Sequence, residues 1–259
     1  MAAAVLETRD LTIRFGGQVA VDRVSCAFHP GTLTAIVGPN GAGKTTYFNL
    51  ISGQLRASAG SVTLRGRDIT RMAAPLRARL GLGRAFQLTN LFPDLSVLEN
   101  VRLAVQARAG VFLDFLSLAV DRTALTERAI GHLRRVRLLD RAGTAAAVLS
   151  HGDQRKLEVA MMLALEPEIF MFDEPTAGMS VDEVPVILDL IEEIKAEGDK
   201  TILLVEHKMD VVRRLADRVI VLHNGALVAD GEPAEVVASA IVQEAYLGVR
   251  PSDRNGADG

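Results

Sequence analysis

A glycine-rich segment near the N-terminus has residue types and spacing suited to binding phosphate. Residues 38–46 read Gly-Pro-Asn-Gly-Ala-Gly-Lys-Thr-Thr and fit the pattern G-x-x-x-x-G-K-[ST]. Glycines let backbone N–H groups curve around phosphate oxygens, Lys44 can reach the β- and γ-phosphates, and the Thr45 hydroxyl can ligate Mg²⁺. The segment predicts a nucleotide phosphate site; the alternative reading is an ordinary glycine-rich turn.

A second candidate group is a pair of carboxylates at the end of an apolar run. Residues 169–172 are Ile-Phe-Met-Phe, and Asp173 and Glu174 follow directly. An aspartate at a strand end can hold Mg²⁺ through water, and the neighbouring glutamate can polarise water for an in-line hydrolysis. The alternative is a solvated acidic pair. Gln87 and His207, which follows the apolar run ending at Val205, carry little information when taken alone.

The predicted elements place these residues at strand ends. Apolar runs at 33–37, 169–172, 201–205 and 218–222, with a helical stretch at 182–197, predict a parallel sheet with crossover helices. A helix is expected directly after the phosphate loop. Alternation over 5–13 and 19–28, joined by Gly16-Gly17, and a short strand at 61–64 predict an antiparallel sheet. Residues 88–149 have helical spacing, and His223-Asn224-Gly225 predicts a hairpin turn.

Composition describes an ordinary globular chain. Of its 259 residues 49% are apolar and 24% charged, and the net charge of −3 gives no support for a broad nucleic-acid surface. The single cysteine, Cys26, excludes an internal disulfide and is expected to be a buried thiol. We see no signal peptide, and the apolar stretch 111–120 is too short to span a bilayer. That stretch is expected to be a core helix or an exposed helix touching a partner, and 251–259 a disordered tail.

The order of these motifs resembles the ATP-binding subunit of an ATP-binding cassette (ABC) transporter over residues 5–248. The resemblance implies an α/β fold: a P-loop NTPase (RecA-like) core with an N-terminal antiparallel β-subdomain and an inserted α-helical subdomain. The implied boundaries are 1–87 and 159–250 for the core with its β-subdomain, and 88–158 for the helical subdomain with the signature motif. Residues 251–259 are left as the tail.

The resemblance also implies roles for individual residues. Glu174 matches the catalytic base, His207 the switch histidine, and Gln87 the glutamine that senses γ-phosphate and metal beside the membrane partner. Thr45, Gln87 and Asp173 match the Mg²⁺ site. The ATP contacts implied are Phe15 against the adenine, the loop residues Asn40, Gly41, Ala42, Gly43, Lys44, Thr45 and Thr46, and the signature residues Ser150, Gly152 and Asp153.

Two segments depart from the family pattern. The signature reads Leu-Ser-His-Gly-Asp over 149–153 instead of Leu-Ser-Gly-Gly-Gln. Asp153 favours a helix start but brings negative charge toward a triphosphate, with Gln154 or Arg155 as candidates to offset it. In the dimer-contact loop after Glu174, Ser180 replaces the usual aspartate, which puts the communication between subunits in doubt.

The resemblance implies two subunits paired head to tail, as a homo- or heterodimer, with each ATP between one subunit's phosphate loop and the other's signature. Transmembrane permease subunits would dock near Gln87 and residues 88–93, with a periplasmic or extracellular solute-binding protein as an indirect partner. The implied place is the cytoplasmic face of the inner membrane.

Residues 89–101, 177–179, 205–209 and 244–248 are similar to the branched-chain (hydrophobic) amino-acid uptake group. Because the solute never touches this subunit, urea or other small-solute import and export remain alternatives. A soluble ABC ATPase without a membrane partner and a binding module without hydrolysis also remain open.

Overall fold

The strands of this protein fall into two groups that differ in how their apolar residues are buried. A computed structural model describes residues 3–85, 91–110 and 118–239. The described chain forms two compact units, the first made of residues up to Leu80 and from Gly198 onward, the second of Gly81–Glu197. Strands with alternating burial lie in the first unit as an antiparallel sheet, whereas strands buried on both faces form parallel pairs.

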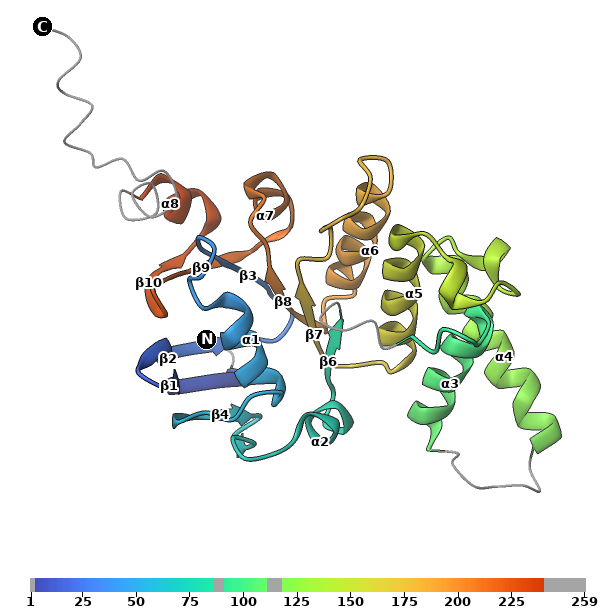
Figure 1. Cartoon of the computed structure of the whole chain (residues 1–259), viewed down its shortest axis with the longest axis horizontal. Helices are drawn as coiled ribbons and strands as arrows, with labels where there is room; N and C mark the ends of the chain where they lie inside the picture. Colours follow the sequence, from blue (N-terminus) through green and yellow to red (C-terminus); the bar gives the residue numbers. More distant parts are fainter. Residues whose placement is uncertain (1–2, 86–90, 111–117, 240–259) are drawn as a thin grey trace, which may run out of the picture. The chain divides into compact units, whose positions relative to one another are not determined.

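The first unit contains both an antiparallel and a mainly parallel sheet (Figure 1). The antiparallel sheet has the order β2-β1-β4-β5, with β1 Leu6–Phe15, β2 Gln18–Phe28, β4 Ala59–Leu64 and β5 Arg67–Asp68. The other strands run in the order β10-β9-β3-β8, with β3 Leu33–Val37, β8 Thr201–Val205, β9 Arg218–His223 and β10 Ala226–Gly231. Its helices are α1 Lys44–Ser52, α2 Ala74–Arg79, α7 Met209–Leu215 and α8 Pro233–Ala238.

The parallel register brings the ends of two strands to one edge. Ile36 of β3 pairs with Val205 of β8 and with Ile220 of β9. The segment after β3 and the segment after β8 therefore leave the sheet side by side, the position at which α/β sheets place ligands. Behind this edge, Val37, Val212 and Val221 share one fully buried cluster that joins the strands to α7.

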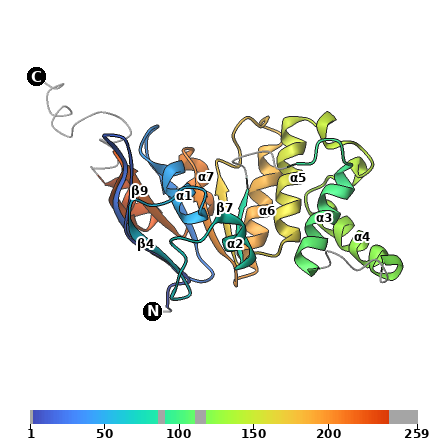
Figure 2. The ribbon, with the colours of Figure 1, turned by 60° about the horizontal axis from the view of Figure 1, so that its bottom comes forward.

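The second unit combines one parallel strand pair with a helical group. β6 Leu82–Ala85 pairs with β7 Ile169–Asp173. The helices α3 Val97–Ala109, α4 Leu118–Arg135 and α5 His151–Ala164 pack against one another (Figures 1 and 2). The remaining elements are the short 3₁₀ turns Leu139–Arg141 and Ala146–Val148 and the helix α6 Val184–Ala196.

Most elements expected from the sequence are confirmed, including the antiparallel hairpin β1–β2, the helix after the phosphate loop and the turn at Asn224-Gly225. Cys26 is 6% exposed, so the expected burial is also confirmed. The expectations for Gln87, for residues 111–117 and for the tail 251–259 lie outside the described residues. The domain boundaries expected from the sequence stay a prediction. Within the described ranges, no helix has the length and apolar character needed to cross a membrane.

Candidate functional site

The phosphate-loop segment turns tightly between β3 and α1. Gly43 has φ 97°, and a Cβ at this position would stand 2.5 Å from the Ala20 carbonyl oxygen, so only glycine fits. The Lys44 ammonium donates to the carbonyl oxygens of Gly38 at 2.7 Å and Pro39 at 3.1 Å. Because these carbonyls belong to the loop itself, they hold the buried ammonium inside the curve that the sequence assigns to phosphate.

Other groups of the predicted nucleotide site in the first unit are open to solvent. Asn40, Gly41 and Thr45 are exposed on the loop and at the start of α1. Phe15, at the end of β1, is 51% exposed, which is unusual for a large aromatic side chain and leaves its ring face free to stack on a flat ligand.

Buried polar contacts fix α1 at both ends. Tyr47 is fully buried, and its hydroxyl shares a 2.8 Å hydrogen bond with Thr8 of β1. Arg77, 1% exposed, donates to the carbonyl oxygens of Leu50 at 2.8 Å and Ile51 at 2.5 Å, which belong to the last turn of α1. Burial lowers the pKa of Arg77 to about 10, so the guanidinium keeps its charge at pH 7.

The residue before the predicted switch histidine has a structural task of its own. Glu206 follows β8 and is fully buried, and its Oε2 accepts from the backbone N–H groups of His207 at 2.9 Å and Lys208 at 3.1 Å. The backbone N–H of Glu206 also donates to the Ile36 carbonyl of β3. His207 is exposed and follows a turn held by this carboxylate, on the same sheet edge as the phosphate loop.

In the second unit, the predicted metal-binding acid Asp173 and the predicted catalytic acid Glu174 have contrasting surroundings. Asp173 ends β7 and is buried, and its Oδ2 accepts from Nη2 of Arg84 on β6 at 2.9 Å. Glu174 is half-buried and has φ 50°, a left-handed conformation that is uncommon for a residue with a side chain. Such a backbone costs energy and is kept only where the surrounding structure imposes it.

The donor chemistry around Asp173 suits Mg²⁺. Among the described residues, no group of three or more histidine, cysteine, aspartate or glutamate side chains forms a cage for a metal ion. Mg²⁺ bound with nucleotides does not need one, because phosphate oxygens and waters supply most of its ligands beside one carboxylate or hydroxyl. The Asp173 carboxylate is the type of donor that such an ion uses.

The signature segment begins α5 with a regular cap. The Ser150 hydroxyl accepts from the backbone N–H of Asp153 at 3.1 Å. The Asp153 carboxylate pairs with the ammonium of Lys156 at 2.8 Å, whereas Arg155 pairs with Glu158. The charge that Asp153 introduces is therefore offset by Lys156, a residue that was not considered from the sequence.

At Gly152, the fourth residue of the signature segment, a neighbouring side chain occupies the space that a Cβ would take. Gly152 is buried, and a Cβ built on it would collide with the carboxylate of Glu183, just before α6. Oε2 of the same carboxylate accepts from the backbone N–H of Ser180 at 3.2 Å and from its hydroxyl at 3.0 Å. One carboxylate thus joins the signature helix to the loop that carries Ser180. His151 also contacts this loop, beside Gly178.

The predicted site residues are divided between the two units. Phe15, the loop residues 40–46 and His207 belong to the first, and Ser150, Gly152, Asp153, Asp173 and Glu174 to the second. Sequence reasoning did not assign tasks to Arg84, Glu183 or Glu206. A charged residue inside an apolar strand, or directly after one, was the only signal available for Arg84 and Glu206.

Comparison with known proteins identifies the family. The family model described as ABC transporter matches residues 21–177. The chain is 38% identical over 253 residues to the high-affinity branched-chain amino acid transport ATP-binding protein LivG of Salmonella typhimurium, covering 96% of this chain and 99% of that protein.

Solved structures agree. A nucleotide-free ATP-binding cassette from an ABC transporter is similar with a TM-score of 0.81 and 29% identity, covering 95% of this chain and 100% of that one. A dimeric ATP-binding cassette in a post-hydrolysis state, bound to ADP and Pi, is similar with a TM-score of 0.76 and 25% identity, covering 88% and 98%. The chain therefore belongs to the ABC transporter family, as an ATPase with the P-loop NTPase fold.

Proposed function

We propose that this chain is the ATP-hydrolysing subunit of an ABC importer that takes up branched-chain or other hydrophobic amino acids. The observation that carries the proposal is the similarity to LivG, because it extends over nearly the full length of both chains. The match includes the helical part of the second unit and not only the phosphate loop.

The residues of the site divide the work of hydrolysis. The loop N–H groups and Lys44 bind the phosphates, and Phe15 stacks on the adenine. Glu174 acts as general base on the attacking water, and His207, held by Glu206, contacts the γ-phosphate. Asp173 and Thr45, with Gln87, would hold Mg²⁺, which neutralises phosphate charge when bound.

The signature segment points to a second ATPase subunit. Ser150 and Gly152 begin α5, where backbone N–H groups and the helix dipole favour an anion. In a head-to-tail pair these groups meet the γ-phosphate of ATP held by the partner subunit. The similar cassette that forms a dimer with ADP and Pi supports this arrangement. The partner is either a second copy of this chain or a different ABC ATPase.

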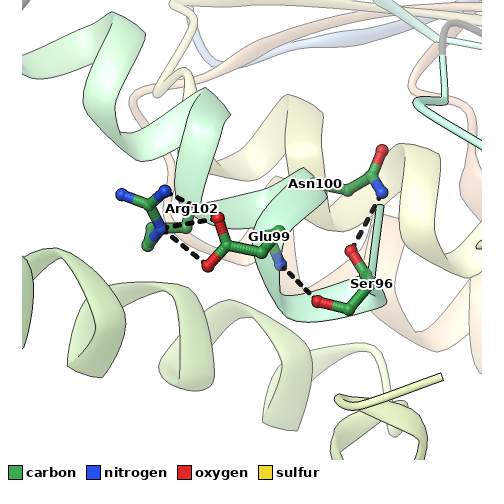
Figure 3. Close-up of polar contacts among 4 residues, drawn as sticks. All are labelled: Ser96, Glu99, Asn100 and Arg102. Carbon is green, nitrogen blue, oxygen red and sulfur yellow. Dashed lines mark hydrogen bonds and ion pairs between the residues drawn. The ribbon is translucent and has the colours of Figure 1, made fainter. Parts of the chain in front are cut away.

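The surface loop over residues 91–96 is held by side-chain hydrogen bonds and is suited to dock the membrane subunits. Asn100 is fully buried on α3, and its Oδ1 accepts from the backbone N–H of Phe92 at 2.8 Å. Its Nδ2 donates to the carbonyl oxygens of Phe92 at 3.1 Å and Ser96 at 3.0 Å. Figure 3 shows the second anchor of this loop, the Ser96 hydroxyl that accepts from the backbone N–H of Glu99.

This clamp keeps apolar side chains at the surface. Phe92 is 49% exposed and Leu95 36% exposed. Val148 is 72% exposed. It directly follows Ala147, whose backbone N–H donates to the Pro93 carbonyl oxygen and so connects this segment to the loop. We name Phe92, Leu95 and Val148 the docking patch. Apolar side chains held outward by buried polar contacts fit an apolar partner segment, and a permease subunit is the partner proposed.

The proposal places the chain at the cytoplasmic face of the inner membrane, bound peripherally through its permease partners. A solute-binding protein would deliver the amino acid from the other side and never touch this chain.

Purification of the tagged chain from detergent-solubilised membranes tests the assignment. We expect two membrane-spanning subunits and a second ATPase subunit to co-purify. Phe92→Asp should lose the membrane subunits yet bind ATP normally, because it charges the docking patch without touching the phosphate loop. Leu165→Asp, at a 40% exposed leucine outside the patch, is the matched control. Purification of wild-type chain free of membrane proteins would contradict the proposal.

A further inference from the structure

A buried arginine holds the carboxylate that the proposed function assigns to Mg²⁺. The side chains of Arg84 and Asp173 are 7% and 6% exposed, and Nη2 of Arg84 donates to Oδ2 of Asp173 at 2.9 Å. The parallel register pairs Arg84 with Met171, so Asp173, two residues further along β7, projects from the same face of the strand pair as Arg84.

Arg84 and Asp173 form a buried ion pair, and neither charge would be favourable at this position without the other. Both side chains are buried and their charged groups are 2.9 Å apart, so each compensates the charge of the other. A buried carboxylate without a positive partner is strongly unfavourable, so Asp173 needs a cation at all times. In protein without nucleotide, that cation is Arg84.

Mg²⁺ bound with ATP would bring a second cation to the same carboxylate. A single aspartate has two oxygens, one of which is already taken by the guanidinium. Two neighbouring cations repel each other more strongly at a buried position such as this one than in bulk water. As long as the Arg84–Asp173 ion pair stays formed, the charge of Arg84 therefore opposes metal binding at Asp173.

We propose that Arg84 is the resident counter-cation of Asp173 and sets the affinity of the nucleotide site for Mg²⁺ by competing with the metal. This inference rests on the proposed metal role of Asp173. Arg84 touches neither ATP nor water in this role and acts through Asp173, so it is a positioning residue. Its effect is to keep the carboxylate ionised and oriented between turnovers while weakening the hold on Mg²⁺.

A Mg²⁺ titration of nucleotide binding tests the inference without relying on turnover. Binding of a fluorescent ATP analogue is followed at rising Mg²⁺ in a Glu174→Gln background. With Arg84→Met the Mg²⁺ midpoint should fall by about tenfold, because one competing charge is removed. Arg84→Lys should keep a midpoint close to that of wild type, because it keeps the charge.

Thermal unfolding gives a second readout. Arg84→Met should be less stable than wild type in EDTA and recover most of that loss with Mg²⁺ and ATP, since the metal replaces the missing cation. Arg155→Met is the matched control, because Arg155 forms a similarly buried pair with Glu158, which has no proposed metal role. It should lose stability with no change in the Mg²⁺ midpoint. If Arg84→Met fails to fold, Arg84→Gln, neutral and polar, takes its place.

The outcomes are distinct. An unchanged midpoint in Arg84→Met or Arg84→Gln would mean that the pair only supports the fold, and a higher midpoint would mean that Arg84 prepares Asp173 for the metal; either overturns the inference. If the proposed metal role of Asp173 is wrong, the result differs again: wild-type protein itself would bind ATP equally well with Mg²⁺ and with EDTA. That result would overturn both the metal role and this inference.

Discussion

At the scale of single residues, the two adjacent carboxylates after β7 show how surroundings separate roles. Asp173 is buried and paired with Arg84, whereas Glu174 is half-buried with a left-handed backbone. Residues in sparsely populated backbone regions concentrate at functional sites, because the strain is kept where it orients a side chain. These surroundings support the proposal that Asp173 binds the metal and Glu174 transfers the proton.

The first prediction concerns the base. Glu174→Gln should bind ATP with the affinity of wild type, because the amide keeps the shape of the side chain and the phosphate loop is unchanged. Hydrolysis should slow by about 10²–10⁴-fold, the contribution typical of a positioned general base. Single-turnover ATP hydrolysis and a fluorescent nucleotide titration measure the two effects separately. Normal turnover would show that another group is the base.

The second prediction concerns the crowded signature glycine. Gly152→Ala should reduce ATP-dependent dimer formation, measured by sedimentation in the Glu174→Gln background, because the added methyl group pushes against Glu183. The double variant Gly152→Ala, Glu183→Ala should recover part of the loss by opening the space. Gly131→Ala on α4 is the control, since a Cβ there meets nothing within 4 Å. An unaffected dimer in Gly152→Ala would contradict the close packing of these two residues.

At the scale of elements, the phosphate loop depends on a short helix anchored from behind. α1 has 9 residues, too few for a stable helix without outside support. Arg77 supplies that support from α2: it closes the last turn of α1 and also donates to the carbonyl oxygens of Thr70 and Met72. These carbonyls come from two segments, the last turn of α1 and residues 70–72, so Arg77 ties the helix to the chain that follows it.

The third prediction tests this anchor. Arg77→Met should lower the free energy of unfolding by about 3 kcal/mol, because several buried carbonyl oxygens lose their donor. Nucleotide affinity should fall as well, since α1 carries Lys44. Arg79→Met, at an exposed arginine on the same helix, should change stability by less than about 0.5 kcal/mol. Urea unfolding curves compare the variants, and equal stabilities would refute the anchoring role.

Elements with continuous apolar runs could be predicted from the sequence, and those with mixed composition could not. β3 and β8 are buried at every position, so their apolar runs stood out. β6 was missed because its four residues include Gly83 and Arg84, which disfavour a strand prediction. The short helix α2 was missed for a similar reason: it has 6 residues and only Arg77 fully buried.

The site followed the same division. The phosphate loop, the acid pair and the signature were recognisable because their residue types and spacing carry chemistry. Lys156 lies three residues after Asp153 on the same helix, so its ion pair follows a local helical spacing. The partners Arg84 and Glu183 were not recognisable, because they reach Asp173 and Gly152 through the fold. Which surface a charged side chain meets depends on the packing of strands and helices distant in the sequence, and no local pattern encodes it.

At the scale of the whole molecule, two features of the chain support the proposal that it works together with other subunits. The N-terminus of the signature helix is suited to bind an anion, which in the proposed dimer is the ATP held by the partner subunit. The docking patch keeps apolar side chains exposed at the surface. Both features are explained by partners: a second ATPase subunit and a permease. ATP binding by two subunits and hydrolysis by Glu174 would then drive the membrane subunits.

The most direct test of this account is uptake of radiolabelled leucine by cells whose chromosomal copy carries Glu174→Gln. We expect uptake driven by the transporter to be lost although the chain is still present at the membrane, while Gly131→Ala cells take up leucine as wild type does. Leucine, isoleucine and valine uptake that is unchanged in the Glu174→Gln cells, with another solute lost in its place, would contradict the assignment to branched-chain amino-acid import.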